Sequence, residues 1–301
     1  LESIPGFNVN ININDFIKQV NDIGICISTM SSNLVPADKK IYSLRDVTGT
    51  VSSMALIASS IMSKKLATGA DKIILDVKYG SGALLKTKEE AIDLAKLMIY
   101  IGTNHGKTTM ALITNMNCPL GNMIGNALEV KEALEILNNK GNQELRELCI
   151  VISTYMVSMS KNISFADASK EVLDTLKNHK AYDKFLELVK IQKGDIESLK
   201  VSDNIIEIRS NVEGYINNID ALTIGELSMK LGAGRIKKDD KIDYSVGIEL
   251  VKTVGDYVKN KDLIAKVYMN KVSINPEEVL KAFTIEKNSI EEEKTIYGVI
   301  K

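Results

Sequence analysis

Histidine and tryptophan are the scarcest functional residue types in this 301-residue sequence, which has two histidines and no tryptophan. His105 lies in the turn-like stretch NHGKTT, and His179 lies in the polar stretch NHKAYDK. Neither has an acidic or nucleophilic partner at a characteristic spacing, so we expect both on the surface. The sequence contains no Ser-His-Asp signature, zinc-ligand spacing or dinucleotide-binding glycine fingerprint. These absences argue against the hydrolases, zinc enzymes and dehydrogenases that are recognised by such motifs.

Cysteine is also rare: Cys26, Cys118 and Cys149 form an odd set without CxxC spacing. This argues against a disulfide framework and predicts reduced thiols in a cytoplasmic protein. No apolar run approaches the ~18 residues of a membrane span, so we expect no membrane association. Thirty-eight basic and 39 acidic residues give a net charge of −1. Without a basic surface, nucleic acid is not an expected partner.

Continuous apolar stretches alternate with amphipathic ones in the first half of the chain. Strands are predicted at 25–29, 72–78 and 108–114, and helices at 14–23, 88–103 and 126–137. This alternation is typical of an α/β fold with a mixed, mostly parallel sheet flanked by helices. Residues 143–192 have a helical pattern throughout. After residue 203, short alternating strands at 205–210, 213–219, 244–251 and 262–269, with one helix at 222–231, predict a C-terminal α+β lobe.

The stretch YSLRDVTGTVSSMALIASSIMSKKLA (42–67) has no charge between Val47 and Ser63, and we predict one helix over 46–67. At 100° per residue, Ser53, Ser60 and Lys64 share a face of that helix. Together with Arg45, these groups suit a planar heterocycle bearing two carbonyls and an N–H. The structural alternative is a set of close-packing serines with a solvated lysine near the helix end.

Two glycine-containing stretches offer weaker candidate sites. KYGSGALL (78–85) follows a strand and could cradle phosphate on its backbone N–H groups, although a tight turn is the favoured interpretation. In CPLGNMIGNALEVKEAL (118–134), Gly121 and Gly125 permit an irregular loop before Glu129 and Glu132. Backbone carbonyls with one carboxylate suit a hard cation. The structural alternative is a loop followed by a solvated helix face.

Several long motifs resemble the thymidine and pyrimidine-nucleoside phosphorylase family. They are RDVTGTVSSMALIASSIMSKKLATGADKIILDVKYGSGAL (45–84), LITNMNCPLGNMIGNALEVKEA (112–133), IQKGD (191–195) and LGAGRIKKDDKIDYSVGIELVKTVGDYVKNKDLIAKVY (231–268). The resemblance runs from LESIPGF to the C-terminal lobe and therefore covers essentially the whole chain. It implies a large α/β domain over 1–36 and 68–202, part of a small helical domain over 37–67, and an α+β lobe over 203–301.

The same resemblance implies site residues. Arg45, Ser60 and Lys64 match pyrimidine-binding and catalytic residues, and Ile61 and Leu84 lie near the apolar base pocket. A potassium ion is implied at the carbonyls of Leu120 and Met123 and at the carboxylate of Glu132. The implied reaction is phosphorolysis of a pyrimidine nucleoside to the free base and a sugar 1-phosphate, with phosphate as co-substrate and a homodimer as the full-length assembly.

One departure from the family pattern bears on activity. The family's Lys-His-Ser and glycine-rich phosphate segment has no match in this sequence, which begins at Leu1 rather than Met. We therefore expect upstream coding sequence to be missing, no phosphate-binding residues in this chain and no activity from it alone. A non-catalytic base-binding module and a related phosphoribosyltransferase are the alternative functions. The sequence leaves open whether thymidine alone or uridine as well is accepted.

Overall fold

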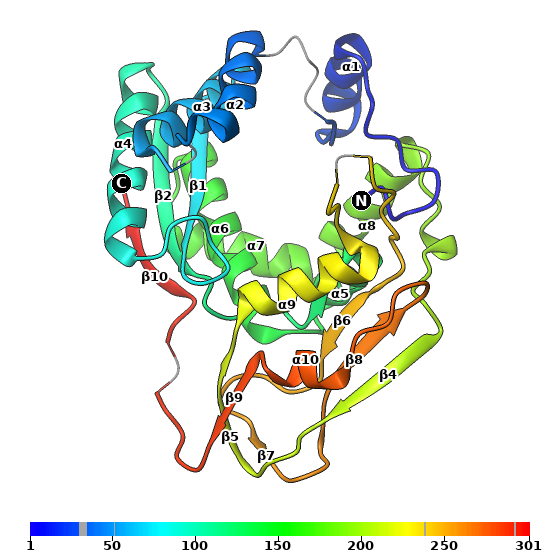
Figure 1. The fold of residues 1–301 in the computed structure, drawn as a ribbon. Coiled ribbons are helices and arrows are strands. Elements are labelled where there is room, and N and C mark those ends of the chain that lie inside the picture. Colours follow the sequence, from blue (N-terminus) through cyan, green and yellow to red (C-terminus); the bar gives the residue numbers. More distant parts are fainter. Residues whose placement is uncertain (30–34, 51, 238, 292) are drawn as a thin grey trace.

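The computed structural model describes residues 1–29, 35–50, 52–237, 239–291 and 293–301 (Figure 1). Within helix α2 (Pro36–Thr48), the description does not extend to the side chains of Lys39, Ser43, Arg45, Asp46 and Val47. The helices and strands form three small sheets flanked by helices, with the C-terminal lobe at the bottom of Figure 1. The predicted α/β class is confirmed.

The first sheet is built around β2 (Thr108–Asn115), which is buried along nearly its whole length. Strand β1 (Lys72–Tyr79) pairs with it in parallel, from Lys72 opposite Thr108 to Tyr79 opposite Asn115. Helix α4 (Lys88–Asn104) makes the crossover between them and packs on both strands. A parallel pair needs such a crossover, which explains the strand–helix–strand pattern of the sequence. Thr87 and Glu90 form the capping box that starts α4.

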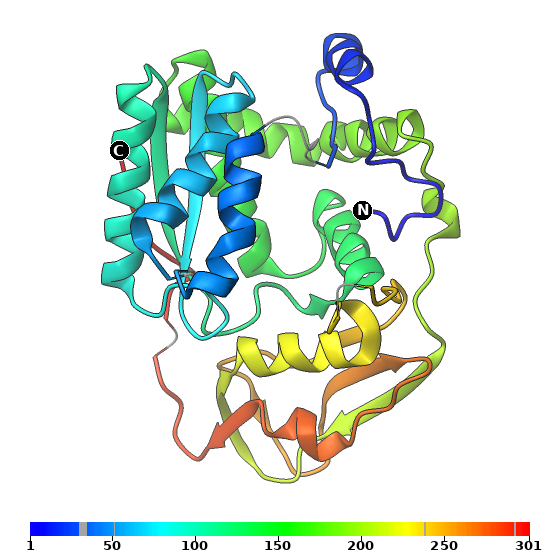
Figure 2. The same ribbon diagram turned by 45° about the horizontal axis from the view of Figure 1, so that its top comes forward.

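Helices α2 and α3 (Met54–Ala67) cover the layer next to α4, and Figure 2 shows them in front of the β1–β2 pair. The core between α3, α4 and the sheet contains Ile57, Met62, Leu75, Leu94 and Met98. Helix α6 (Gln143–Lys161) contacts β1. This part of the chain is therefore organised around the short parallel β1–β2 pair.

The helical prediction for 143–192 is confirmed by α6, α7 (Phe165–Lys177) and α8 (Lys180–Ile191), which are joined by short turns. Helix α5 (Asn126–Leu137) precedes them at its predicted bounds. Among the described residues no single helix has the length and apolar composition of a membrane span, and α6 and α7 reach that threshold only as a pair bent by 119°.

Two antiparallel sheets form the C-terminal lobe, although one of them includes a strand from residues 123–124 and the last strand of the chain, Ile296–Ile300, joins the first sheet. One has the order β3 (Met123–Ile124), β6 (Gly247–Leu250), β8 (Leu263–Met269), β4 (Asn204–Arg209). The other has the order β7 (Tyr257–Val258), β5 (Gly214–Ile219), β9 (Phe283–Glu286). Helices α9 (Ala221–Ser228) and α10 (Pro276–Leu280), a 3₁₀ turn at Ile196–Ser198 and a π turn at Met229–Ala233 complete this region.

The strand pairing is less parallel than the sequence pattern indicated. Among the described strands, β1–β2 is the only parallel pair, and β10 (Ile296–Ile300) adds to β2 in the antiparallel direction. The strands after residue 203 are all paired antiparallel. A continuous apolar sequence indicates that both faces of a strand are buried, but it does not fix the direction of the neighbouring strand. The buried strand β2 accordingly has a parallel neighbour in β1 and an antiparallel one in β10.

The predicted strand at 25–29 is wrong. These residues form an extended segment without a strand partner, and the side chain of Gln192 satisfies much of their backbone. Its Nε2 donates to the Ile27 and Asn8 carbonyls at 2.7 Å, and its Oε1 accepts from Ile27 N at 3.0 Å. One buried amide therefore joins α1 (Ile13–Ile23) and its flanks to α8.

The single helix predicted over 46–67 is also wrong, because it is divided into α2 and α3. Helix α2 ends at Thr48, and Gly49 follows in the left-handed conformation with φ of +65°. Glycine adopts that conformation at little energetic cost, so it ends helices effectively. Ser53 then occupies the N-cap position of α3 instead of lying on the predicted helix face.

Candidate functional site

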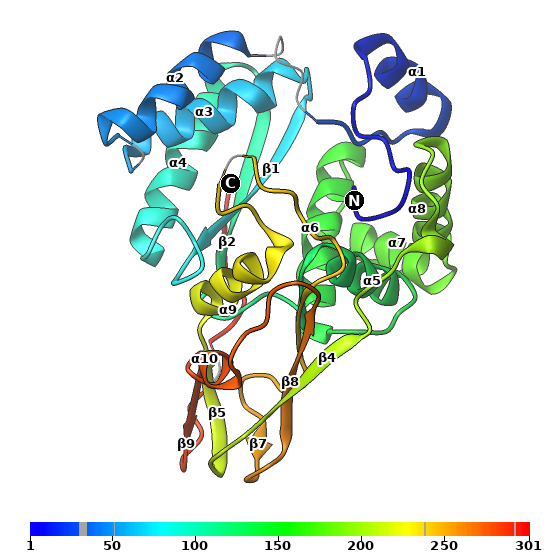
Figure 3. The same ribbon diagram turned by 45° about the vertical axis from the view of Figure 1, so that its right-hand side comes forward.

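The α2–α3 pair brings two of the predicted base-binding residues into direct contact, and Figure 3 shows the two helices side by side. Ser60 is 7% exposed on the inner side of α3. One turn later, the Lys64 ammonium donates to Ser60 Oγ at 2.8 Å and to the Ser60 carbonyl at 2.9 Å. The serine hydroxyl accepts this bond, so its own proton is available to another acceptor.

Lys64 also has partners on α2. Its Nζ lies 2.6 Å from Asp38 Oδ2 and 5.9 Å from the centre of the Tyr42 ring. The Asp38 side chain is only 10% exposed. A lysine ammonium has three N–H donors, and the two Ser60 oxygens with the Asp38 carboxylate supply three acceptors. The cluster is therefore a charge-compensated polar site between two helices.

The other predicted base-pocket residues are not joined to this cluster by any described contact. Ile61 is half-buried and packs on the core between α3 and the sheet. Leu84, in the loop between β1 and α4, is 59% exposed. The Arg45 side chain lies outside the described part of the chain, although its backbone belongs to α2. The roles of these three residues stay predictions.

The glycines at 80 and 82 serve close packing in a turn, which supports the favoured interpretation of KYGSGALL. Gly80 has φ of +122°, and a Cβ there would lie 2.6 Å from Asn117 Oδ1. A Cβ on Gly82 would lie 2.7 Å from Ala221 Cβ. Residues with side chains would therefore push the turn away from the loop after β2 and from α9.

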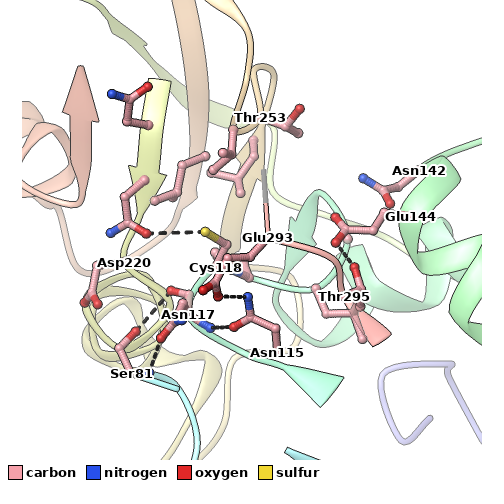
Figure 4. A pocket seen from close by; sticks show the side chains of 18 of the residues that line it. Ser81, Asn115, Asn117, Cys118, Asn142, Glu144, Asp220, Thr253, Glu293 and Thr295 are labelled. Carbon is pink, nitrogen blue, oxygen red and sulfur yellow. Dashed lines mark hydrogen bonds between the residues drawn. The ribbon is translucent and has the colours of Figure 1, made fainter. Parts of the chain in front are cut away.

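A polar cavity of about 370 Å³ lies beside this turn, between the ends of β1 and β2 and the C-terminal lobe (Figure 4). Ser81 N donates to Asn117 Oδ1 at 3.0 Å, and Asn117 N donates to Asn115 Oδ1 at 2.9 Å. Asn115 Nδ2 in turn donates to Glu293 Oε2 at 2.9 Å. Much of the hydrogen-bonding capacity of these polar side chains is thus used within the wall itself.

A second cluster surrounds Glu132, which is 3% exposed on α5. Its Oε1 accepts from Asn122 N at 2.6 Å, and its Oε2 accepts from Met123 N at 3.3 Å. Gly121 has φ of +80°, and a Cβ there would lie 2.4 Å from Glu132 Oε2. The glycine therefore lets the loop close over the carboxylate.

The predicted cation residues line one cavity of about 860 Å³ between α5, α6 and α7, which Leu120, Met123, Glu129 and Glu132 border. Leu120 also borders the smaller polar cavity. Apolar residues form most of the remaining wall; they include Ile136, Leu137, Leu145, Ile150, Val157, Val172 and Leu176. Leu120, Met123 and Glu132 therefore line the same cavity, and their role as cation ligands stays a prediction.

The electrostatics of this cluster are those of an uncompensated acid. Burial raises the pKa of Glu132 against the opposing effect of its two backbone N–H donors, and the nearby acids Glu135 and Glu129 raise it further. Burial likewise raises the pKa of Glu129. Within the described residues neither Glu129 nor Glu132 forms an ion pair. Desolvated carboxylates without an ion-pair partner suit a cation, so Glu132 and Glu129 fit the potassium ion that the resemblance implies.

Sequence reasoning missed Asp38 and Asn122. Asp38 lies in the first turn of α2, where an acid is ordinarily explained by the helix dipole. Its ion pair with Lys64 depends on the α2–α3 arrangement, which the single-helix prediction excluded. Asn122 contributes mainly through its backbone N–H, which any residue except proline would offer.

Comparisons with known proteins agree with this organisation. Residues 1–182 match the family model "Glycosyl transferase family, a/b domain", and residues 215–286 match "Pyrimidine nucleoside phosphorylase C-terminal domain". The chain is 48% identical over 282 residues to a pyrimidine-nucleoside phosphorylase of Staphylococcus epidermidis. The corresponding identities are 45% for Bacillus subtilis and 44% for Geobacillus stearothermophilus.

Each of these three alignments covers 91% of this chain and 65% of the relative. The chain therefore spans about two thirds of the length of the curated relatives that it matches. The two family models lie in chain order on the α/β part and the C-terminal lobe, and the identities extend across both. On this evidence, the chain belongs to the pyrimidine-nucleoside phosphorylase family.

Proposed function

We propose that this chain carries the nucleobase-binding part of a pyrimidine-nucleoside phosphorylase. The reaction is attack of phosphate on the anomeric carbon of the nucleoside, which releases the free pyrimidine and leaves a ribose or deoxyribose 1-phosphate. The observation that carries this proposal is the Ser60–Lys64 pair, which presents a buried hydroxyl and a held ammonium within the segment that resembles the family signature. Residues 37–67 would then be the helical-domain part of the cleft.

The departing base becomes increasingly anionic as its bond to the sugar breaks. The ammonium of Lys64 and the guanidinium of Arg45 stabilise that charge at the base carbonyls. Ser60 Oγ accepts a hydrogen bond from Lys64, so its own proton remains for a base carbonyl. Its second lone pair can instead accept the base N–H. Such groups lower the barrier when they bind the charged transition state more tightly than the neutral substrate. Ile61 and Leu84 supply apolar contacts to the ring.

A potassium ion held by Leu120, Met123 and Glu132 would supply positive charge between the 118–125 loop and α5. Glu132 fits that role because its carboxylate is buried without an ion-pair partner in the described part of the chain. The ion's contribution is structural in this proposal, and the catalytic groups are those on α2 and α3. Phosphate is the co-substrate, and a cytoplasmic homodimer is the proposed full-length assembly.

Calorimetric titration with uracil and with thymine tests the base site. Wild-type protein is expected to bind at least one of these bases, and Lys64→Ala is expected to weaken the affinity by about 100-fold, as for loss of a charged hydrogen bond. Lys65→Ala is the matched control, because this neighbouring lysine is exposed. Equal affinities for the Lys64 and Lys65 variants would refute the proposed base site.

Activity is assayed separately as phosphate-dependent release of uracil from uridine and of thymine from thymidine. We expect none from these 301 residues alone, because a Lys-His-Ser phosphate segment is not among them. Release at a rate that depends on phosphate would disprove this expectation and would confirm phosphorolysis itself.

A further inference from the structure

Lys64 is held by a partner on a different helix, and this contact has a consequence for the proposed base site. Asp38 lies in the first turn of α2, 26 positions before Lys64 near the end of α3. The carboxylate and the ammonium are 2.6 Å apart, and the side chains are 10% and 27% exposed. Low exposure strengthens the attraction relative to that of a surface pair.

Besides the weaker contact with the Tyr42 ring at 5.9 Å, Lys64 has two other hydrogen-bond acceptors, and these cannot define its direction in the same way. Both are oxygens of Ser60, one turn earlier on the same helix, and by themselves they hold the lysine back along α3. Asp38 supplies the acceptor from α2 and so fixes the ammonium in the space between the helices. We propose, on the basis of the proposed function, that Asp38 is a positioning residue that orients Lys64 for the nucleobase.

The number of N–H donors on the Lys64 ammonium determines how it can bind a nucleobase. An ammonium has three protons, and Ser60 O, Ser60 Oγ and Asp38 Oδ2 already supply three acceptors. A base carbonyl must therefore replace one of them. The ammonium bonds more strongly to an ionised carboxylate than to a neutral oxygen, so a Ser60 oxygen is displaced from the ammonium before the Asp38 carboxylate is. Asp38 keeps its contact with Lys64 while the base takes up the donor released by Ser60.

The test compares uracil affinity, by calorimetry, for wild type, Asp38→Asn and Asp22→Asn. Asp22 is the matched control because it pairs with Lys18 on the exposed surface of α1. Asp38→Asn keeps the size of the side chain and removes its charge, and about tenfold weaker binding is expected, as for a misplaced binding group. Asp22→Asn should bind as wild type does. Unchanged or tighter binding by Asp38→Asn overturns the proposal.

A second measurement does not depend on ligand binding. In protein labelled with ¹⁵N at lysine Nζ, the held ammonium of Lys64 should give a signal protected from exchange with water, assigned by its loss in Lys64→Arg. Asp38→Asn should abolish this protection, whereas Asp22→Asn should preserve it. A wild-type protein without a protected Lys64 signal overturns the positioning role even if the variant does not fold.

The two measurements separate two kinds of failure. If wild type binds neither uracil nor thymine, the proposed base site fails, whereas an Asp38-dependent Lys64 signal still supports the positioning contact. If wild type binds uracil and the Lys64 signal is unaffected by Asp38→Asn, the base site stands and the positioning role is wrong.

Discussion

The two polar clusters of this protein handle buried charge in opposite ways. Between α2 and α3, the Lys64 cation is surrounded by oxygen acceptors that include the Asp38 carboxylate. Under the 118–125 loop, the Glu132 anion receives two backbone N–H groups and lies near another desolvated acid, Glu129. Net charge is compensated in the first cluster and is left over in the second.

This difference indicates what each cluster can accept. A ligand of the first cluster must compete with internal partners, so a neutral group with well-placed carbonyls is suited to it. A ligand of the second cluster must bring positive charge, because backbone N–H groups solvate a carboxylate without neutralising it. The proposed pyrimidine at the first cluster and the proposed potassium ion at the second would meet these requirements.

Gly121→Ala should have the largest effect, because it acts on the backbone that encloses Glu132. The added Cβ would lie 2.4 Å from Glu132 Oε2, at a residue with φ of +80°. We expect a loss of about 3 kcal/mol in the free energy of unfolding from steric and backbone strain. Urea denaturation measures it. Gly106→Ala is the control, since Gly106 has φ of +71° and open space around it. Equal losses in both variants would show that the loop is not tightly closed over Glu132.

Lys64→Met should have the next largest effect on stability. The substitution keeps an unbranched side chain but removes the Lys64 ammonium from the little-exposed Asp38 carboxylate. The expected loss is about 2 kcal/mol in the free energy of unfolding, the usual effect of removing one partner of a charged hydrogen bond. Lys65→Met should change stability little, because Lys65 is exposed. If both variants retain wild-type stability, the first cluster is not charge-compensated in solution.

Glu132→Gln should change the free energy of unfolding in the opposite direction. In potassium-free buffer at pH 7 the amide removes a desolvated charge and still offers an acceptor to Asn122 N, although it loses the longer bond from Met123 N. Stability should therefore stay equal or rise by up to about 1 kcal/mol. Potassium chloride should then raise the melting temperature of wild type and not that of the variant. Choline chloride at the same ionic strength is the control. A potassium response that persists in Glu132→Gln would exclude this carboxylate as a ligand.

The smallest expected effect is on pH dependence. Burial holds the folded-state pKa of Glu132 above its ordinary value of 4.5, so the folded protein binds a proton there before the unfolded chain does. Its contribution to stability is therefore largest at low pH and is lost as pH rises through the window above 4.5. The unfolding free energy of wild type minus that of Glu132→Gln should fall as pH rises through this window. A difference that is flat or rises with pH would contradict the assignment.

The sequence predicted elements well where the local pattern alone decides them. The bounds of β1, β2, α4 and α5 match their predictions to within one residue, and Thr87 caps α4 as expected. Hydrophobic periodicity and capping chemistry act over a few residues and are therefore visible without the fold. The loop around Glu132 was also found from sequence, because its glycines mark an irregular backbone beside an acid-bearing helix.

Features that depend on distant partners were missed. The extended segment at 25–29 is apolar like a strand, yet it bonds to the side chain of Gln192 from α8. The break at Gly49 separates α2 from α3 and lets Asp38 reach Lys64. Neither contact has a local signal, because a glutamine near a helix end and an aspartate in a first turn are ordinary residues there.

The Gln192 contacts also bear on how the first 29 residues stay attached. A strand in a sheet is protected by a row of hydrogen bonds that open one after another, whereas this segment shares one amide side chain between Asn8 and Ile27. The amide proton of Ile27 should therefore exchange with solvent whenever the end of α8 frays, even while its own neighbours remain in place. Gln192→Leu would remove the side-chain bonds to Asn8 and Ile27 in a single step, while the backbone bonds Asn8 N–Gln192 O and Thr29 N–Val9 O would remain. We expect the chain near residue 27 to become more sensitive to proteases.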